Sequence, residues 1–502
     1  MSSVSRRTFL AAALGSTALA ALPGYASEAM PFTHDFVVAK ARALAAKAFA
    51  ERPMVPQDWQ DQSYDDYKSR WFRTSDALWA GTGRSYNVDF FLPGLYFPRA
   101  VQVHTVTDGM AEHVPFDINL FDKNEKAPDL SSEGNLGYSG LRLRTDLGHP
   151  TKKTEFAVFQ GASYFRAIGN GNAYGLSARG LALKTADPEG EEFPEFTEFW
   201  LEAPAPGQRS MVVHALMDSP SVAGAYRFTI TPGRSTVMDV EATLFAREEL
   251  SHAGLAPLTS MFLFDSTNPG RFDDFRPAVH DSEGLLILNG NGETLWRPLA
   301  NPNRLQVSSF VDTSPRGFGL MQRSRKLSDF NDLEAFYHTR PSLWVEPKGD
   351  WGKGAVTLVE IPADKEIYDN IVAYWRPREP YAAGSEINLS YRLTWGEEPV
   401  LPMPRVINTA SGERIFGGEG RIVTIDFEAH PLFDGGPETL GIHVSSPQAE
   451  TSEGVLQRNP ETGGMRLAFY FDPGESNHAE LRAQLLKDGK PASEVWLYRW
   501  TS

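Results

Sequence analysis

The sequence of 502 residues contains no cysteine, which excludes thiol catalysis, disulfides, iron–sulfur clusters and thiolate-bound zinc. Its 11 histidines include no HxxxH or HxH pair, so we expect no transition-metal site. It has no Walker loop, no glycine fingerprint between a strand and a helix, and no GxSxG serine elbow. Carboxylate chemistry remains, and we expect no metal or other cofactor.

Long apolar runs are also missing, and the run at the N-terminus is too short to span a bilayer. The motif SRRTFL at 5–10 is a twin-arginine signal, and the apolar run 10–22 follows it. Small residues at 24 and 26 offer a cleavage site. We therefore expect residues 1–26 to be a signal peptide, and the mature protein to work in the periplasm.

Positive charge is scarce, since the chain carries a net charge of −16 and would lose Arg6 and Arg7 with the signal. A surface of this sign repels nucleic acid and anionic lipid. Aromatic residues make up 12% of the chain, which is enough to line a cleft as well as fill a core. A neutral substrate is therefore favoured, and no nucleic-acid partner is expected.

Helical patterns are few. They cover 35–51, which is rich in alanine, and 64–71. From about Tyr86 onward, short alternating or apolar runs are separated by turns drawn from 43 glycines and 35 prolines, which predicts a mainly β protein. We expect one large domain over 27–396.

A proline-rich stretch at 397–404 predicts an extended linker. After it, residues 405–502 contain alternating runs at 421–428, 465–471 and 494–500. Short strands over that length indicate an immunoglobulin-like β-sandwich without its disulfide.

Residues 360–376 place acids before a pair of aromatic residues. Carboxyl groups move protons, aromatic rings stack on sugars, and desolvation raises the pKa of a carboxyl toward that of a general acid. An acidic loop leading into a core strand explains the pattern equally simply, and composition alone favours that alternative. The residues concerned are Glu360, Asp364, Glu366, Asp369, Tyr374 and Trp375.

A second candidate carboxyl is Asp281, which lies beside His280 in a polar stretch at 276–284. That stretch is also compatible with an ordinary turn. A lone histidine is more often structural than catalytic. Sequence spacing does not decide whether Asp281 meets Asp369.

Several blocks interleave rings with charged residues, as in sugar-binding clefts. A single ring in such a block is more often part of a core, but their number indicates some carbohydrate contacts. The candidate contact residues are Tyr164, Arg166, Trp200, Trp296, Arg297, Trp344, Trp351, Tyr374 and Trp375.

Eight ordered blocks together resemble the periplasmic glucan biosynthesis proteins, types G and D, which act on osmoregulated periplasmic glucans. The twin-arginine signal favours type D. The blocks are GASYFRAIGNGNAYGLSARGLA (161–182), GEEFPEFTEFW (190–200), LAPLTSMFLF (255–264), RPAVHDSEGL (276–285), NGNGETLWRPL (289–299), GFGLMQR (317–323), DWGKGAVTLVEIP (350–362) and DNIVAYW (369–375).

The resemblance implies a large β-sandwich followed by a smaller immunoglobulin-like one. It also implies an inverting glycoside hydrolase or transglycosylase acting on linear β-1,2-glucan. Asp369 matches the family's general acid and Asp281 its proposed base. Glu366 matches a further acid, which we expect close enough to raise the pKa of Asp369. The family reads DETNDN where this chain has KEIYDN at 365–370, so its rate or its subsites are expected to differ.

Two alternatives remain open. A non-catalytic protein that binds glucan and guides it from a membrane glucosyltransferase would need the same rings and acids. Hydrolysis of another polysaccharide would also fit the residue chemistry. The resemblance further makes a homodimer possible, in which the partner covers the cleft.

Overall fold

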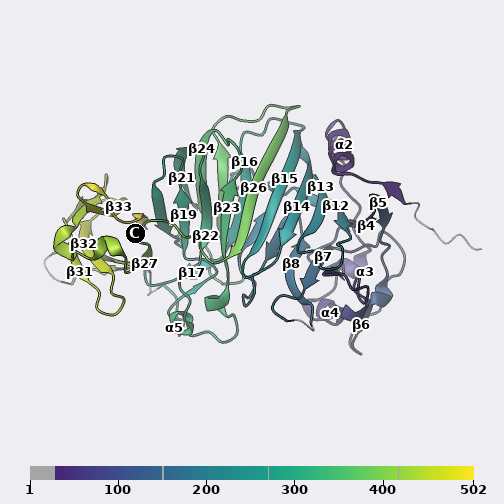
Figure 1. Ribbon diagram of the computed structural model, residues 1–502, viewed down its shortest axis with the longest axis horizontal. Helices are drawn as coiled ribbons and strands as arrows, with labels where there is room; N and C mark the ends of the chain where they lie inside the picture. Colours follow the sequence, from purple (N-terminus) through teal and green to yellow (C-terminus); the bar gives the residue numbers. More distant parts are fainter. Residues whose placement is uncertain (1–28, 150–151, 269–270, 416–417) are drawn as a thin grey trace, which may run out of the picture.

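The computed structural model describes residues 29–149, 152–268, 271–415 and 418–502, so the predicted signal peptide lies outside the described residues. The described chain confirms the predicted mainly β fold, with a large β-sandwich followed by a smaller one (Figure 1). Within these residues, no helix is long and apolar enough to cross a membrane.

The longest sheet has 16 strands and runs through both parts of the molecule; we call it the long sheet. In spatial order its strands are β1 (Met30–Pro31), β5 (Met110–His113), β4 (Gln102–Thr107), β12 (Glu195–Glu202), β13 (Met211–Asp218), β14 (Val222–Thr231), β15 (Thr236–Ala246), β26 (Glu386–Gly396), β23 (Ser342–Pro347), β22 (Gly317–Met321), β19 (Gly284–Leu288), β20 (Thr294–Pro298), β35 (Val495–Thr501), β33 (His478–Lys487) and β29 (Gly441–Ser445), with β34 (Lys490–Pro491) paired to β33.

A second sheet of ten strands packs against it; we call it the site sheet, because its outer face carries the candidate site. Its strands are β21 (Gln306–Thr313), β24 (Lys353–Glu360), β25 (Ile371–Pro377), β16 (Ala253–Ser260), β10 (Ser177–Arg179), β9 (Tyr164–Ala167), β8 (Thr154–Gln160), β7 (Gly140–Thr145) and β3 (Asn87–Phe91), with β11 (Leu181–Leu183) paired to β16.

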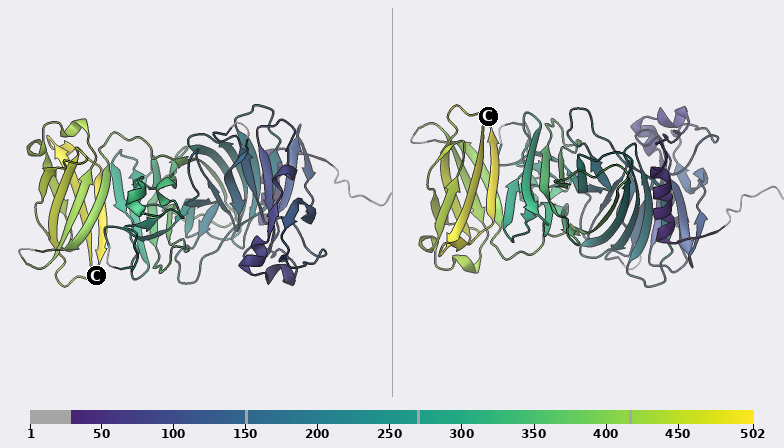
Figure 2. Two further views of the ribbon diagram at one scale, coloured as in Figure 1. Left: turned by 90° about the horizontal axis from the view of Figure 1, so that it is seen from below. Right: turned by 90° about the horizontal axis from the view of Figure 1, so that it is seen from above.

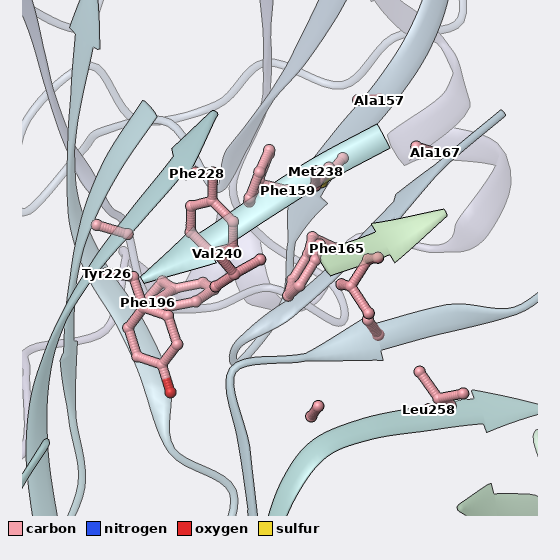
Figure 3. Close-up of a cluster of buried hydrophobic side chains, with 14 of the residues drawn as sticks. Ala157, Phe159, Phe165, Ala167, Phe196, Tyr226, Phe228, Met238, Val240 and Leu258 are labelled. Atoms are coloured by element: carbon pink, nitrogen blue, oxygen red, sulfur yellow. The ribbon is translucent and has the colours of Figure 1, made fainter. Parts of the chain in front are cut away.

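The main core lies between these two sheets. Figure 3 shows rings from both sheets meeting there, with Phe159 and Phe165 of the site sheet against Phe228 of the long sheet. Strand alternation explains the division in β9, because Phe165 points into the core while Tyr164 and Arg166 point to the outer face. The core therefore fixes which residues of β9 are available to a ligand.

The smaller sandwich pairs the last strands of the long sheet with a five-stranded C-terminal sheet. The parallel pairing of β20 with β35 matches Trp296 to Trp496, so backbone hydrogen bonds join the two sandwiches. Figure 2 shows these layers forming one end of an elongated molecule. The C-terminal sheet consists of β27 (Val406–Glu413), β28 (Arg421–Phe427), β32 (Met465–Asp472), β30 (Glu450–Thr451) and β31 (Val455–Arg458).

The predicted N-terminal helix is present but short. Helix α2 (His34–Ala45) packs Val37 and Ala41 on the outer face of the long sheet and ends well before residue 51. Beyond Ala45 the next three residues are exposed, so no buried face supports further turns. The helix predicted at 64–71 likewise stops early, because residues 70–72 enter a strand instead.

The remaining elements are short. They are α3 (Gln57–Gln60), α4 (Tyr64–Lys68), α5 (Leu327–Phe330), the two-stranded sheets β2 (Arg70–Phe72) with β6 (Phe121–Lys123) and β17 (Phe262–Phe264) with β18 (Val279–His280), and the 3₁₀ turns Thr74–Asp76, Ile118–Leu120, Tyr337–Thr339, Pro431–Phe433 and Pro437–Thr439.

Candidate active site

Asp369 lies at the end of the loop that joins β24 to β25. The next residue, Asn370, fixes this loop end from within the protein: its side chain accepts a hydrogen bond from the Phe262 amide at 2.8 Å. It donates to the carbonyls of Phe262 at 2.9 Å and Ile361 at 3.0 Å. The position of Asp369 is therefore set by a buried amide clamp on two neighbouring segments.

Asp281 directly follows β18, and its backbone amide donates to the Met261 carbonyl at 2.8 Å. Its buried carboxyl accepts a hydrogen bond from Arg340. The pKa of Asp281 is raised to about 6: burial raises it most, the charge of Asp369 also raises it, and Arg340 opposes both effects.

The structure brings Asp369 and Asp281 within electrostatic range, although 88 positions separate them in the chain. Asp369 reaches solvent, yet the protein atoms around it desolvate its carboxyl and raise its pKa. The guanidinium groups of Arg166, Arg179 and Arg340 lower the pKa of Asp369 in part. Both carboxyls thus hold a proton more readily than in water while facing a shared group of cations.

Two predicted contact residues lie at this pair of acids. Arg166 acts on the pKa of both Asp369 and Asp281. Tyr164 lies under the Arg179 guanidinium, 4.9 Å from its ring centre, and the charge of Asp369 contributes to its raised pKa, after the larger effect of burial. Both project from the outer face of β9, where the strand period places them together.

Two arginines of the site were not predicted. Arg179 donates to Thr259 Oγ1 at 2.9 Å and pairs with Glu191. Arg340 lies four positions before Trp344, which was a predicted contact residue. The sequence signal that could have identified Arg340 was an arginine close to aromatic residues. In the structure, its guanidinium stacks over the Tyr337 ring, 4.3 Å from the ring centre.

Glu366 does not act as expected. Its carboxylate binds Arg276 at 2.6 Å, and the charges that act on the pKa of Asp369 are those of the three arginines. The cause predicted for the raised pKa of Asp369 is therefore wrong, because desolvation rather than the charge of Glu366 raises it. Glu366 is instead paired with Arg276.

Six of the nine predicted sugar contacts have side chains that are buried in the described structure, which argues against the direct stacking on sugar predicted for them. Trp200 lies under helix α2, and Trp296 and Trp344 lie between the two sandwiches. The other three are Arg297, which pairs with buried Glu360 at 3.1 Å, Tyr374, which bonds His252 at 2.8 Å, and Trp375, which is part of the main core.

Trp351 is half-buried at the rim of the main core and meets Tyr391 edge-on at 6.0 Å. Its described contacts are with the main core and with Tyr391, and they include neither Asp369 nor Asp281. Among the described residues, no group of three or more histidine, aspartate or glutamate side chains could hold a metal ion.

A polar cavity of about 500 Å³ lies on the other side of Asp281, between the two sandwiches. His280 and Glu283 line it, whereas Asp281 between them turns to Arg340. Burial raises the pKa of Glu283 to about 7 and lowers that of His280 to about 4. The segment 280–283 therefore separates two polar regions: the Asp281 carboxyl lies on one side of it and this cavity on the other.

Residues 32–500 match the family described as "Periplasmic glucan biosynthesis protein, MdoG". The chain belongs to this family. It is 50% identical to "Glucans biosynthesis protein G" of Vibrio cholerae, over 94% of this chain and 87% of that protein. The same-named protein of Shewanella frigidimarina is 48% identical, over 94% of this chain and 85% of its own length.

Membership confirms the predicted resemblance and places the protein in periplasmic glucan biosynthesis. Both relatives are named protein G, so the preference for type D rests on the twin-arginine residues alone. A galactose mutarotase-related enzyme from Lactobacillus acidophilus matches with a TM-score of 0.21 and 9% identity, over 48% of this chain and 96% of that one, and this likeness carries no argument.

Proposed function

We propose that this protein is an inverting enzyme acting on linear β-1,2-glucan in the periplasm, as a hydrolase or a transglycosylase. The observation that carries the proposal is the meeting of two acids with raised pKa values, Asp369 and Asp281, at a face that presents Tyr164 and Arg166. The β-1,2 linkage and export by the twin-arginine route rest on the family resemblance and on the N-terminal motif.

In this mechanism, Asp369 donates its proton to the glycosidic oxygen as the bond from carbon to oxygen breaks. A water molecule or a sugar hydroxyl attacks the anomeric carbon from the opposite face and gives its proton to Asp281. Arg340 keeps Asp281 ionised before this step. Bound glucan would displace water from Asp369 and raise its pKa further.

An inverting mechanism requires a particular separation between its two carboxyl groups. Carboxyl pairs of inverting enzymes stand about 6.5–9.5 Å apart, which leaves room for the nucleophile. Since Asp281 is nearly sealed from solvent, its proton would arrive through a short relay if the attacking oxygen lies beyond direct reach.

The decisive experiment is an assay of purified Asp369→Asn on linear β-1,2-glucan. We expect a loss of at least about a hundredfold in kcat, because the general acid is removed while the shape is kept. Asp364→Asn is the matched control, since Asp364 is an exposed acid of the same loop. Near-full activity of Asp369→Asn would rule out the assigned role.

The second candidate is a glucan-binding protein without catalysis that assists assembly beside a membrane glucosyltransferase. The observation in its favour is the family description, which names biosynthesis rather than hydrolysis. Incubating the wild-type protein with linear glucan and analysing chain lengths separates the two. Shorter or cyclic products support the enzyme, and unchanged chains support the binding protein.

A further inference from the structure

A group of exposed apolar side chains lies close to the candidate acids. Phe275 is 81% exposed, Leu333 70%, Ile367 75% and Tyr368 50%. We call these four side chains the platform. Clustered exposure of this kind in an acidic, charged chain marks a surface that meets a ligand or a partner.

Three loops that carry the platform are tied together at Arg276. Its guanidinium donates to Glu366 Oε2 at 2.6 Å, to Asp332 Oδ2 at 2.8 Å and to Asp274 Oδ2 at 2.8 Å. Several charge-assisted bonds on one partly buried guanidinium hold their partners in a defined geometry. The loops are therefore fixed relative to one another.

Each carboxylate bound to Arg276 is followed in sequence by a platform residue: Phe275 follows Asp274, Leu333 follows Asp332 and Ile367 follows Glu366. Consecutive Cα atoms are about 3.8 Å apart. The backbone at Phe275, Leu333 and Ile367 is consequently held near the same guanidinium, and the centre of the Phe275 ring itself lies 6.0 Å from the guanidinium carbon of Arg276.

The platform borders the candidate acids. Tyr368 directly precedes Asp369. The Tyr337 ring lies between the two clusters: burial raises its pKa most, and the charges of both Glu366 and Asp281 raise it further. Arg340, the partner of Asp281, stacks over the same ring at 4.3 Å. A chain bound at Asp369 would continue directly onto the platform.

We propose that the platform binds sugar residues of the glucan chain beyond the cleaved bond, and so sets the preferred chain length. This inference rests on the proposed function. The apolar C–H face of a pyranose packs on aromatic and aliphatic surfaces without a counter-ion, and the carboxylates around Arg276 accept hydrogen bonds from hydroxyl groups.

The test compares kcat/KM for linear β-1,2-gluco-oligosaccharides of increasing length in Phe275→Ala and Tyr368→Ala. We expect roughly a three- to tenfold loss on long chains, the contribution of one stacked ring. The shortest chain that is cleaved should be unaffected. Tyr368→Phe should retain wild-type values, because it keeps the ring.

Tyr64→Ala is the matched control, because Tyr64 is 58% exposed and lies on α4, far from α5 (Figure 1). Equal losses at all lengths, or none at any length, would overturn the inference. So would a fall in molar mass by light scattering in either variant, since the platform would then be an interface between two copies of the chain. If the wild-type protein cleaves no chain, the proposed function fails, and calorimetric affinities for the same oligosaccharides then decide the inference by the same length dependence.

Discussion

At the scale of single residues, two aspartates obtain different properties from different surroundings. Asp281 is sealed and bonded to Arg340, whereas Asp369 reaches solvent among three arginines. The sealed carboxyl has a fixed cationic partner that favours its ionised form, which suits the base role proposed for it. The open carboxyl can exchange protons with solvent, which suits the acid role proposed for it.

Arg340→Gln tests this division through the pH profile. Arg340 lowers the pKa of Asp281, so removing its charge should raise that pKa above its present value of about 6. A base works only when deprotonated, and the acid limb of kcat/KM should therefore move to higher pH, by about one unit. Steady-state assays from pH 4 to 9 measure the shift.

Arg340→Lys is the control for charge, since it keeps the cation but loses the planar donors. It should return the limb toward its original position. An acid limb that stays in place, or moves to lower pH, in Arg340→Gln would contradict the role of Asp281 as the base.

At the scale of elements, the Asn370 amide joins three of them. It links the end of β24, the start of β25 and the short strand β17 through three hydrogen bonds. The loop end that carries the exposed Asp369 is thereby anchored by buried hydrogen bonds. The geometry of the candidate acid therefore depends on a buried neighbour.

Asn370→Ala should destabilise the protein by about 2–4 kcal/mol, because buried backbone groups of Phe262 and Ile361 lose their partners. Urea unfolding measures this change. Asn388→Ala on the exposed face of β26 should stay within about 0.5 kcal/mol. A stability equal to that of the control would show that the clamp contributes nothing.

At the scale of the whole molecule, the two sandwiches share structure. The parallel pair β20 and β35 continues one sheet from the first into the second. The core between them joins Trp296 and Trp344 of the large sandwich to the C-terminal sheet. Buried Arg323 adds ion pairs to Glu398 in the connecting segment and to Glu494 in the C-terminal part.

We therefore expect the described chain to unfold in one cooperative calorimetric transition, since neither sandwich can melt without exposing the shared core. Glu494→Ala should lower the stability by about 3–5 kcal/mol, because it leaves the buried Arg323 short of a partner. Glu453→Ala, an exposed acid of the same part, is the control. Two separate transitions in the wild-type protein would contradict the shared core.

The predictability of the site differed by residue type. Asp369 and Asp281 could be singled out because acids in particular blocks matched a family pattern. The aromatic sugar contacts could not be singled out in this way, because an aromatic residue on a strand indicates only that one face of the strand is apolar. In β25, Trp375 faces the main core and Tyr374 faces a smaller cluster on the opposite side, so both faces are covered and alternation gives no signal.

The sequence by itself determined the mainly β class and the scarcity of helix, and it singled out the two acids as candidates, since composition, period and motif are local properties. The tertiary structure alone decided that Asp281 meets Asp369, that Arg340 and Arg179 accompany them, and that Arg276 draws three loops together. These juxtapositions depend on which strands pair and which faces are buried. Strand pairing and the burial of each face are both set by long-range packing, and no local pattern of residues indicates either of them.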